Sequence, residues 1–215
     1  MAGIPPFRAY LFDVDGTLLD SAPDICGAVS SVLAGTTKPD VPHEYLRTFI
    51  GRHLIDLFGE LFPEAPAGQV EAWIQQYRET YLSRGHVNTK LYPAVAETLA
   101  LLGGLKTTAT TKGTTTATMV LRQFGLIDHF DHVQGTDGFP SKPEPEVLRR
   151  AMEALGVRPQ ECLMIGDSVP DIVAARAAGV KVCAVSYGYG DPEHLRAQEP
   201  DYWIDSFGEL APAGG

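Results

Sequence analysis

The sequence predicts an α/β protein with a doubly wound parallel sheet that is interrupted after its first strand by a small helical insert. One short apolar strand precedes a segment with only helical patterns, which extends to about residue 88. From about residue 90, strands and helices alternate, as is typical of a parallel sheet with helices on both faces. A chain of 215 residues can form such a core and a small accessory domain. We therefore expect an α/β core of residues 1–17 and 90–215, with residues 18–89 inserted between them.

The first two predicted elements are a strand and an amphipathic helix. Apolar side chains dominate residues 8–12, and Gly16 marks the turn that follows. Residues 21–24 read SAPD, which is a capping-box arrangement with proline in the first helical turn. Apolar residues then recur at helical spacing: Ile25, Ala28, Val29, Val32 and Leu33.

The rest of the insert contains three further helical patterns and no strand pattern. Apolar residues mark them in three groups: Tyr45, Leu46, Phe49 and Ile50; Leu54, Ile55, Leu57, Phe58 and Leu61; and Val70, Trp73, Ile74, Tyr77 and Tyr81. Gly51 and Gly85 are the expected C-terminal ends of the first and third of these helices. Together with the preceding helix, they would form a small bundle with its own apolar core.

Beyond the insert, the pattern alternates between strands and helices. We expect helices at residues 93–102, 114–124 and 145–155, and a fourth that ends at residue 178. The expected strands are 105–110, 130–134, 162–165, 181–185 and, at the edge of the sheet, 202–204. Glycines at 103–104, 156 and 179 stand where the helices are expected to end.

The composition is that of an ordinary globular protein, and the net charge of −10 limits its partners. A strongly acidic protein is a poor partner for nucleic acid and for anionic membranes, which both bind basic surfaces. A small anionic substrate remains compatible, because a divalent cation and a few lysines reverse the charge locally. The three cysteines, Cys26, Cys162 and Cys183, have no metal-ligand spacing, so reduced and buried thiols are expected.

Neither a leader segment nor a membrane span is expected. The N-terminal residues MAGIPPFRAY lack the apolar region of a signal peptide, and no run approaches about eighteen apolar residues. The sequence therefore predicts a cytoplasmic protein without nucleic-acid or membrane partners, present as a monomer or a homodimer.

Acidic, hydroxyl and lysine side chains follow the predicted strands at the edge where open parallel sheets bind ligands. In chain order they are Asp13 and Asp15, then Thr110, Thr111 and Lys112, then Lys142, then Asp167 and Asp171. Three carboxylates at one point repel one another unless a cation lies among them, and Mg²⁺ suits carboxylate and phosphate oxygens. The hydroxyl of Thr110 and the ammonium of Lys142 can hold other oxygens of a phosphoryl group. One aspartate can then act as nucleophile and a second as proton donor to the leaving group.

Each of these segments alone also has a simpler explanation. An EF-hand calcium loop is excluded, because Leu18 and Asp24 occupy the positions that require glycine and glutamate. The other structural alternatives are a turn at residues 15–16, a polar loop and N-cap at 110–116, a solvated loop lysine at Lys142 and a helix start at Asp167. The ordered set, with each member just past a predicted strand, favours a catalytic site.

Four segments together resemble the motifs of the haloacid dehalogenase superfamily. They are DVDGT (13–17), TTK (110–112), KPEP (142–145) and GDSVPD (166–171). The stretch LFDVDGTLLDSAPDI is similar to the phosphoglycolate phosphatase branch of that superfamily. The resemblance extends over nearly the whole chain, and it implies that residues 18–89 are the small α-helical cap of the family.

The resemblance implies a chemical role for each matching residue. Asp13 would be the nucleophile that attacks phosphorus, and Asp15 would be the general acid and then the base that activates water. The hydroxyl of Thr110 and the backbone amide of Thr111 would bind the phosphoryl group. Lys142 would offset the charge of the nucleophile and of the phosphate.

The resemblance also implies a magnesium site. Asp13 would ligate Mg²⁺ through its carboxylate and Asp15 through its backbone carbonyl, while Asp167 would complete the site. Asp171 would bind the ion through water or orient its neighbours.

Asp15 distinguishes two chemistries within the family. Dehalogenases of this type have no acid two residues after the nucleophile, so its presence favours phosphoryl transfer. We therefore predict a magnesium-dependent phosphatase that hydrolyses a small phosphorylated metabolite, best represented by 2-phosphoglycolate, through an aspartyl-phosphate. Thr111 stands where the second motif often has asparagine, so the chain departs from the family pattern at this position.

The cap adds one candidate for substrate binding and leaves several alternatives open. Arg52, between two predicted helices, would suit a carboxylate or a second phosphate, although it can equally be an exposed loop arginine. A pyrophosphatase, a sugar-phosphate phosphatase or a phosphomutase would share the same core motifs. A non-catalytic binding module is a further alternative. A phosphonate hydrolase is disfavoured, because it needs a cap lysine and residues 18–88 contain only Lys38.

Overall fold

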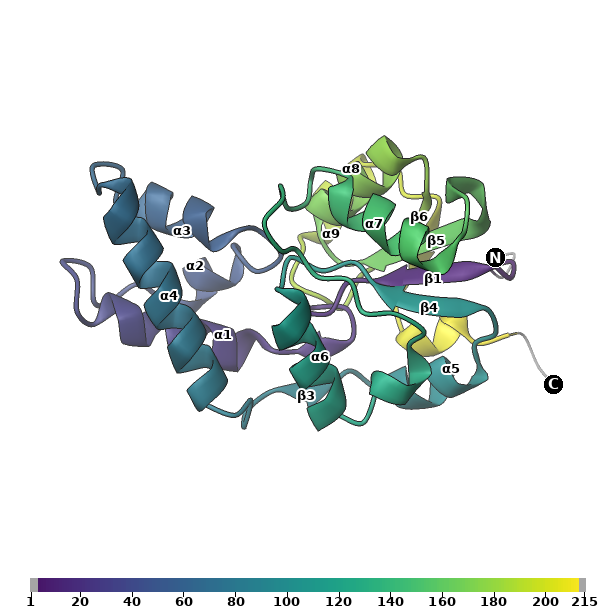
Figure 1. Ribbon diagram of the computed structural model, residues 1–215, viewed down its shortest axis with the longest axis horizontal. Helices are drawn as coiled ribbons and strands as arrows, with labels where there is room; N and C mark the ends of the chain where they lie inside the picture. The colour runs from purple at the N-terminus through teal and green to yellow at the C-terminus, as the bar shows by residue number, and fades with distance from the viewer. Residues whose placement is uncertain (1–3, 213–215) are drawn as a thin grey trace. The chain divides into compact units, whose positions relative to one another are not determined.

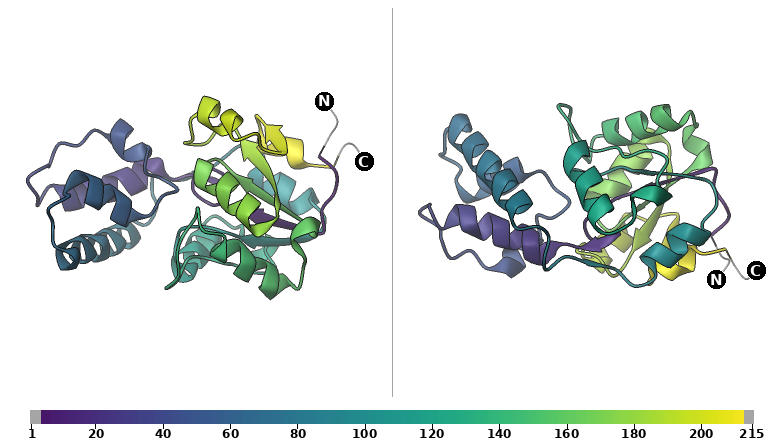
Figure 2. Two further views of the ribbon diagram at one scale, coloured as in Figure 1. Left: turned by 90° about the horizontal axis from the view of Figure 1, so that it is seen from above. Right: turned by 60° about the horizontal axis from the view of Figure 1, so that its bottom comes forward.

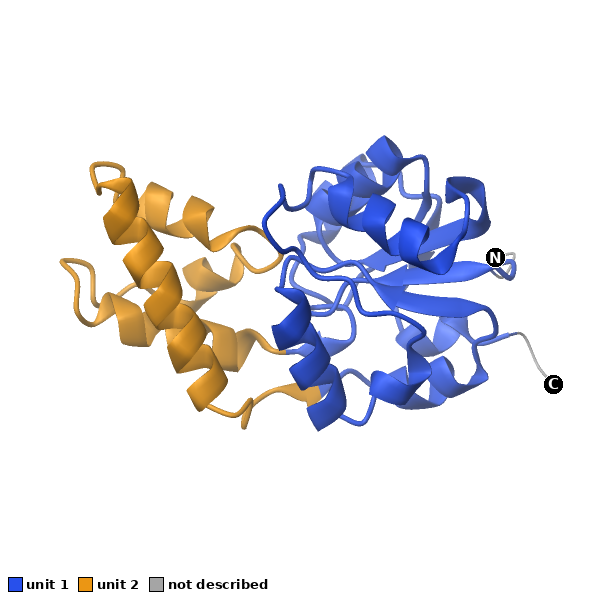
Figure 3. Ribbon diagram, viewed as in Figure 1, with its two compact units in different colours: residues 1–20, 91–215 blue, residues 21–90 orange. Residues whose placement is uncertain are grey.

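The computed structural model describes residues 4–212 and contains two compact units (Figure 3). One comprises residues 1–20 and 91–215 and is here called the α/β unit; the other, residues 21–90, is called the helical unit. The division lies slightly beyond the predicted boundaries, because Leu18 and Leu19 are buried in a core cluster of the α/β unit.

The α/β unit contains a five-stranded parallel sheet with the strand order β4-β1-β5-β6-β7. The strands are β1 (Ala9–Phe12), β4 (Leu105–Thr108), β5 (Cys162–Gly166), β6 (Lys181–Val185) and β7 (Tyr202–Ile204). In this register Phe12, the last residue of β1, lies opposite Thr108 and Ile165. The predicted parallel sheet is thus confirmed, and the residues that follow β1, β4 and β5 emerge at one edge.

Helices cover both faces of this sheet (Figures 1 and 2). They are α5 (Val95–Leu101), α6 (Thr114–Gln123), α7 (Glu146–Leu155), α8 (Val169–Ala178) and α9 (Pro192–Ala197), with short 3₁₀ turns η1 (Ile127–His129), η2 (Pro159–Glu161) and η3 (Phe207–Leu210). Successive side chains of a strand point to opposite faces, so Ala9 and Leu11 pack against α7 and α8, while Tyr10 and Phe12 pack against α5 and α6. The doubly wound architecture follows from these two buried faces.

The predicted strand at residues 130–134 is wrong. The structure has only an isolated bridge there, between His132 and Thr107. The hydroxyl of Thr108 accepts from the Gln134 amide (2.8 Å) and donates to the Gln134 carbonyl (2.9 Å). The side chain of Thr108 therefore bonds to the amide and the carbonyl of Gln134, which a neighbouring strand would otherwise pair. A second, two-stranded sheet of β2 (Leu19–Asp20) and β3 (Lys90–Leu91) was not apparent from the sequence.

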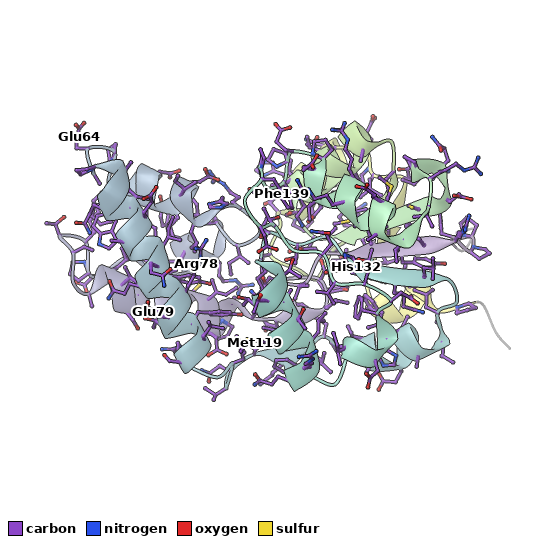
Figure 4. All side chains as sticks on the ribbon, in the orientation of Figure 1. Glu64, Arg78, Glu79, Met119, His132 and Phe139 are labelled. Atoms are coloured by element: carbon purple, nitrogen blue, oxygen red, sulfur yellow. The ribbon has the colours of Figure 1, made fainter. Side chains whose placement is uncertain are left out.

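The helical unit contains the four helices expected from the sequence. They are α1 (Ala22–Leu33), α2 (His43–Arg47), α3 (Leu54–Leu61) and α4 (Ala67–Ser83). On α4, Tyr77 and Tyr81 are buried one turn apart, whereas Arg78 and Glu79 are exposed (Figure 4). No helix within residues 4–212 is both long enough and apolar enough to cross a membrane.

The predicted capping box at the start of α1 is wrong, because its acidic member bonds elsewhere. Ser21 is the N-cap residue but makes no side-chain cap hydrogen bond. The Asp24 carboxylate accepts from the amide of Asn88 (2.9 Å), its side chain (3.0 Å) and the hydroxyl of Thr89 (2.8 Å). Burial opposes ionisation of Asp24, but the hydrogen bonds from Thr89 and Asn88 lower its pKa below the usual value. An ionised carboxylate thus ties the start of α1 to the segment that follows α4.

Candidate active site

The carboxyl end of β1 positions the first two acids. The Asp13 amide donates to the Ile165 carbonyl (2.9 Å), which continues the pairing of β1 with β5. The chain then turns at Gly16, whose φ of +88° favours glycine. A Cβ atom at Gly16 would overlap the carboxylate of Asp167. Glycine is therefore required here both for the turn and for the close approach of the acid that follows β5.

Three of the predicted site acids converge at this edge. The carboxylates of Asp13, Asp167 and Asp171 each place an oxygen within 4.8 Å of the other two, and all three residues are at most 2 % exposed. Asp171 lies in the first turn of α8, where its Oδ2 accepts from the amide (3.0 Å) and hydroxyl (2.6 Å) of Ser168. This capping box fixes the orientation of the Asp171 side chain. The second carboxylate oxygen of Asp171, Oδ1, then faces the other acids.

Lys142 lies buried among these carboxylates. Its Nζ is 2.9 Å from Asp13 Oδ1 and 2.5 Å from Asp171 Oδ1. Burial alone would lower the pKa of Lys142, but the negative charges of Asp13 and Asp171 raise it above its usual value. Burial also raises the pKa of Asp13 to about 6, although the charge of Lys142 opposes this shift. The lysine is thus a permanent cation beside the predicted nucleophile.

Asp167 receives its hydrogen bonds from two neutral donors. The hydroxyl of Thr17 donates to Oδ1 (3.0 Å), and the amide of Tyr189 donates to Oδ2 (2.8 Å). Burial, together with the charges of Asp171 and Asp13, raises the pKa of Asp167 to about 8. Neither donor is apparent from the sequence, because neither carries a charge and Tyr189 donates through its backbone.

The three carboxylates and one lysine leave a buried excess of negative charge. Within residues 4–212, Asp13 Oδ2 is buried and has no hydrogen-bond partner. A buried carboxylate oxygen without a partner is costly, and such an oxygen beside other carboxylates suits a hard divalent cation. The residues present therefore fit Mg²⁺.

The loop after β4 brings two threonines to the same edge. Thr110 is fully buried, and its hydroxyl oxygen accepts from the Lys112 amide (3.3 Å). Its carbonyl accepts from the hydroxyl of Thr136 (2.9 Å). Because the Thr110 oxygen already accepts, its hydroxyl hydrogen can donate to a phosphoryl oxygen. Thr111 follows directly and is half-buried.

A second lysine approaches the other acid of the first motif. Lys112 Nζ lies 2.6 Å from Asp15 Oδ2, and the two side chains are only 9 % and 8 % exposed. A role for Lys112 is not apparent from the sequence, although Lys112 belongs to the TTK segment at the same sheet edge.

Arg52, the substrate-binding candidate, belongs to the helical unit. Its Nε is 3.9 Å from Asp56 Oδ2, and both side chains are substantially exposed. The guanidinium also lies over the ring of Phe49, 4.5 Å from its centroid. An exposed ion pair of this length contributes little stability, so the side chain can exchange Asp56 for another anion.

Comparison with known proteins defines the class to which this fold and site belong. Residues 10–185 match the haloacid dehalogenase-like hydrolase family, so the chain belongs to that family. Over 94 % of its length the chain is 37 % identical to a Vibrio vulnificus protein named phosphoglycolate phosphatase, of which it covers 94 %. A Nitrosospira multiformis protein of the same name is 34 % identical, with 95 % of this chain and 94 % of that protein aligned.

A solved structure extends the comparison to the fold. The crystal structure described as a predicted phosphatase from Clostridium acetobutylicum superposes with a TM-score of 0.89 at 30 % identity. The superposition covers 96 % of this chain and 97 % of that one. The predicted family, fold class and enzyme type, a hydrolase similar to phosphoglycolate phosphatases, are therefore confirmed.

Proposed function

We propose that this chain is a magnesium-dependent phosphatase that hydrolyses a small phosphorylated metabolite, 2-phosphoglycolate above all, through an aspartyl-phosphate on Asp13. The observation that carries the proposal is the buried Asp13 carboxylate, with Oδ1 paired to Lys142 and Oδ2 without a protein partner. A carboxylate held in this way is oriented for nucleophilic attack. The names of the relatives support the choice of substrate.

In the first half-reaction, an oxygen of Asp13 attacks phosphorus and the bond from phosphorus to the leaving oxygen breaks. The hydroxyl of Thr110, the amide of Thr111 and the ammonium of Lys142 bind the phosphoryl oxygens. Asp15 donates its proton to the departing alkoxide, which leaves as an alcohol. The products of this step are the alcohol and an aspartyl-phosphate on residue 13.

In the second half-reaction, water attacks the phosphorus of the aspartyl-phosphate. Asp15, now a carboxylate, accepts a proton from that water. The bond between phosphorus and the Asp13 oxygen breaks, which releases phosphate and restores both acids to their starting forms. One acid therefore serves both steps, as donor and then as acceptor.

Mg²⁺ would be held by Asp13, the backbone carbonyl of Asp15 and Asp167, with Asp171 binding through water or orienting its neighbours. When bound, the ion supplies positive charge that offsets the charge of the phosphoryl oxygens and of the carboxylates.

Phosphate release from a panel of substrates tests the proposed function. We expect kcat/KM for 2-phosphoglycolate to exceed that for a sugar phosphate by about tenfold or more, the effect of one charge-assisted hydrogen bond to its carboxylate. Para-nitrophenyl phosphate should also be hydrolysed, since its leaving group needs no proton. A higher kcat/KM for pyrophosphate or a sugar phosphate would contradict the choice of substrate. No phosphate release from any substrate would favour a non-catalytic binding module.

Removal of the metal should abolish turnover, and changing a proposed ligand should weaken metal binding. EDTA should stop phosphate release, and added Mg²⁺ should restore it. Asp167→Asn should raise the Mg²⁺ concentration needed for half-maximal activity and reduce the stabilisation by Mg²⁺ in a thermal unfolding experiment. The exposed Asp128→Asn is the matched control. Activity that survives both EDTA and Asp167→Asn unchanged would refute the metal assignment.

We further propose that the helical unit acts as the cap and that Arg52 binds the anionic part of the leaving group. Arg52→Ala should raise KM for 2-phosphoglycolate by about tenfold and leave para-nitrophenyl phosphate nearly unaffected. Arg78→Ala, which changes an exposed arginine of α4, is the control and should affect neither substrate. Equal effects of Arg52→Ala on both substrates, or none, would remove Arg52 from the site.

A further inference from the structure

Two lysines contact three of the four acidic side chains assigned to the site. Lys142 contacts Asp13 and Asp171, the acids assigned to nucleophilic attack and to the metal region. Lys112 contacts Asp15, the acid assigned to proton transfer, at 2.6 Å. Exposed ion pairs contribute little, but this short pair is more than nine-tenths buried on both sides. It therefore holds the Asp15 carboxylate more firmly than a surface lysine would.

The backbone of Lys112 is held from both directions. Its amide donates to the Thr110 hydroxyl (3.3 Å), and its carbonyl accepts from the Thr136 amide (2.8 Å). A Cβ atom at Gly135 would overlap the Lys112 carbonyl, so the neighbouring loop can approach this closely only with glycine there. Because the backbone is already ordered, only side-chain entropy is lost when Lys112 is held against Asp15.

The chemistry of an ammonium group determines what this contact does. The Nζ of Lys112 can only donate, so Asp15 Oδ2 is an acceptor in the pair. The proton that Asp15 exchanges with the leaving group and with water is then carried on Oδ1. A carboxylic acid whose torsion is fixed presents that proton in a constant direction, which general acid–base catalysis requires.

We propose that Lys112 is a positioning residue for Asp15: it holds Oδ2 so that Oδ1 carries the proton in both half-reactions. This proposal rests on the proposed phosphatase function. Lys112 then affects proton transfer by Asp15 and has no effect on the binding of phosphate.

The test compares the rates of phosphorylation and dephosphorylation of the enzyme in Lys112→Met and in Asp15→Asn. Rapid-quench single-turnover experiments use 2-phosphoglycolate, whose alkoxide needs a proton, and para-nitrophenyl phosphate, whose phenolate does not. We expect Lys112→Met to slow phosphorylation by 2-phosphoglycolate about 10²-fold, with a much smaller effect for para-nitrophenyl phosphate. Hydrolysis of the phosphoenzyme should slow as well, and KM should change little. Asp15→Asn should show the same pattern with larger losses.

Three further variants make the result interpretable. Lys112→Arg keeps the charge and should restore part of the lost rate. Lys112→Gln keeps a donor without the charge, and it supplies the same comparison if the methionine variant unfolds. Lys106→Met changes another buried lysine, which bonds to the Gly104 carbonyl (3.2 Å), and it should leave the ratio of the two phosphorylation rates unchanged.

Several outcomes would overturn the proposal. They are equal losses with both leaving groups, no loss with either, or a rise in KM for 2-phosphoglycolate alone, which would make Lys112 a ligand for the substrate. A wild-type enzyme that forms no phosphoenzyme and releases no phosphate would instead refute the proposed function, so the two failures are distinguishable.

Discussion

Asp13→Asn is expected to reduce turnover to background with every phosphate monoester. The neutral amide that replaces the carboxylate beside Lys142 is not a nucleophile. The fold should persist, because the substitution removes a buried charge that Asp171 repels, and Lys142 keeps its contact with Asp171.

Two measurements check this expectation. Phosphate release is followed with 2-phosphoglycolate and with para-nitrophenyl phosphate, and mass spectrometry after acid quenching detects any phosphoenzyme. The thermal midpoint in EDTA should be no lower than that of the unsubstituted chain, which separates lost chemistry from lost folding. Asp128→Asn, at an exposed position, should retain full activity. A variant that is still phosphorylated within the segment that contains residue 13 would contradict the assigned nucleophile.

Lys142→Met is expected to abolish turnover and also to destabilise the fold. The substitution leaves Asp13 and Asp171 buried beside each other without their shared cation. Breaking a buried ion pair from one side costs about 3–5 kcal/mol, which corresponds to a fall of roughly 6–20 °C in Tm for a chain of this size. Denaturant unfolding in the presence of EDTA measures the free energy of unfolding of the metal-free protein, in which no bound cation compensates the loss of the lysine charge.

A double variant tests the cause of that loss. Adding Asp171→Asn to Lys142→Met removes one of the two uncompensated charges, so part of the lost stability should return while turnover stays at background. Lys181→Met, which changes an exposed lysine, should alter the free energy of unfolding by no more than about 0.5 kcal/mol. An unchanged Tm for Lys142→Met would show that the three groups are not a buried ion network in solution.

Local patterns predicted the parallel sheet and the edge at which the acids gather. The buried apolar residues of β1 directly precede Asp13, and those of β5 directly precede Asp167. Both strands were apparent from composition alone. Parallel strands end at the same edge of the sheet, so the position at which each strand ends predicts that these acids lie close together. Apolar spacing also predicts α1 to α8, and glycines end α7 and α8 as expected. However, α2 ends at Arg47, before the expected Gly51, and α9 was not predicted.

Local patterns failed where a side chain bonded to a distant partner. Residues 21–24 satisfy the capping-box pattern, yet Asp24 bonds to Asn88, 64 positions along the chain. Residues 130–134 have the composition of a strand, but the hydroxyl of Thr108 takes the backbone groups of Gln134. In both cases a side-chain hydrogen bond to a residue distant in the sequence replaced the hydrogen bond that the pattern predicts.

The fold class, the order of the motifs and the sheet edge that carries the acids are all predictable from the amino-acid sequence, because they depend on apolar periodicity and on where strands end. The pairing of each lysine with its acid becomes apparent only in the folded chain. Lys112 meets Asp15 across 97 positions and Lys142 meets Asp171 across 29, through loops whose paths depend on packing. A charge interacts with whatever the fold brings within a few ångströms of it, and spacing along the chain does not specify that neighbour.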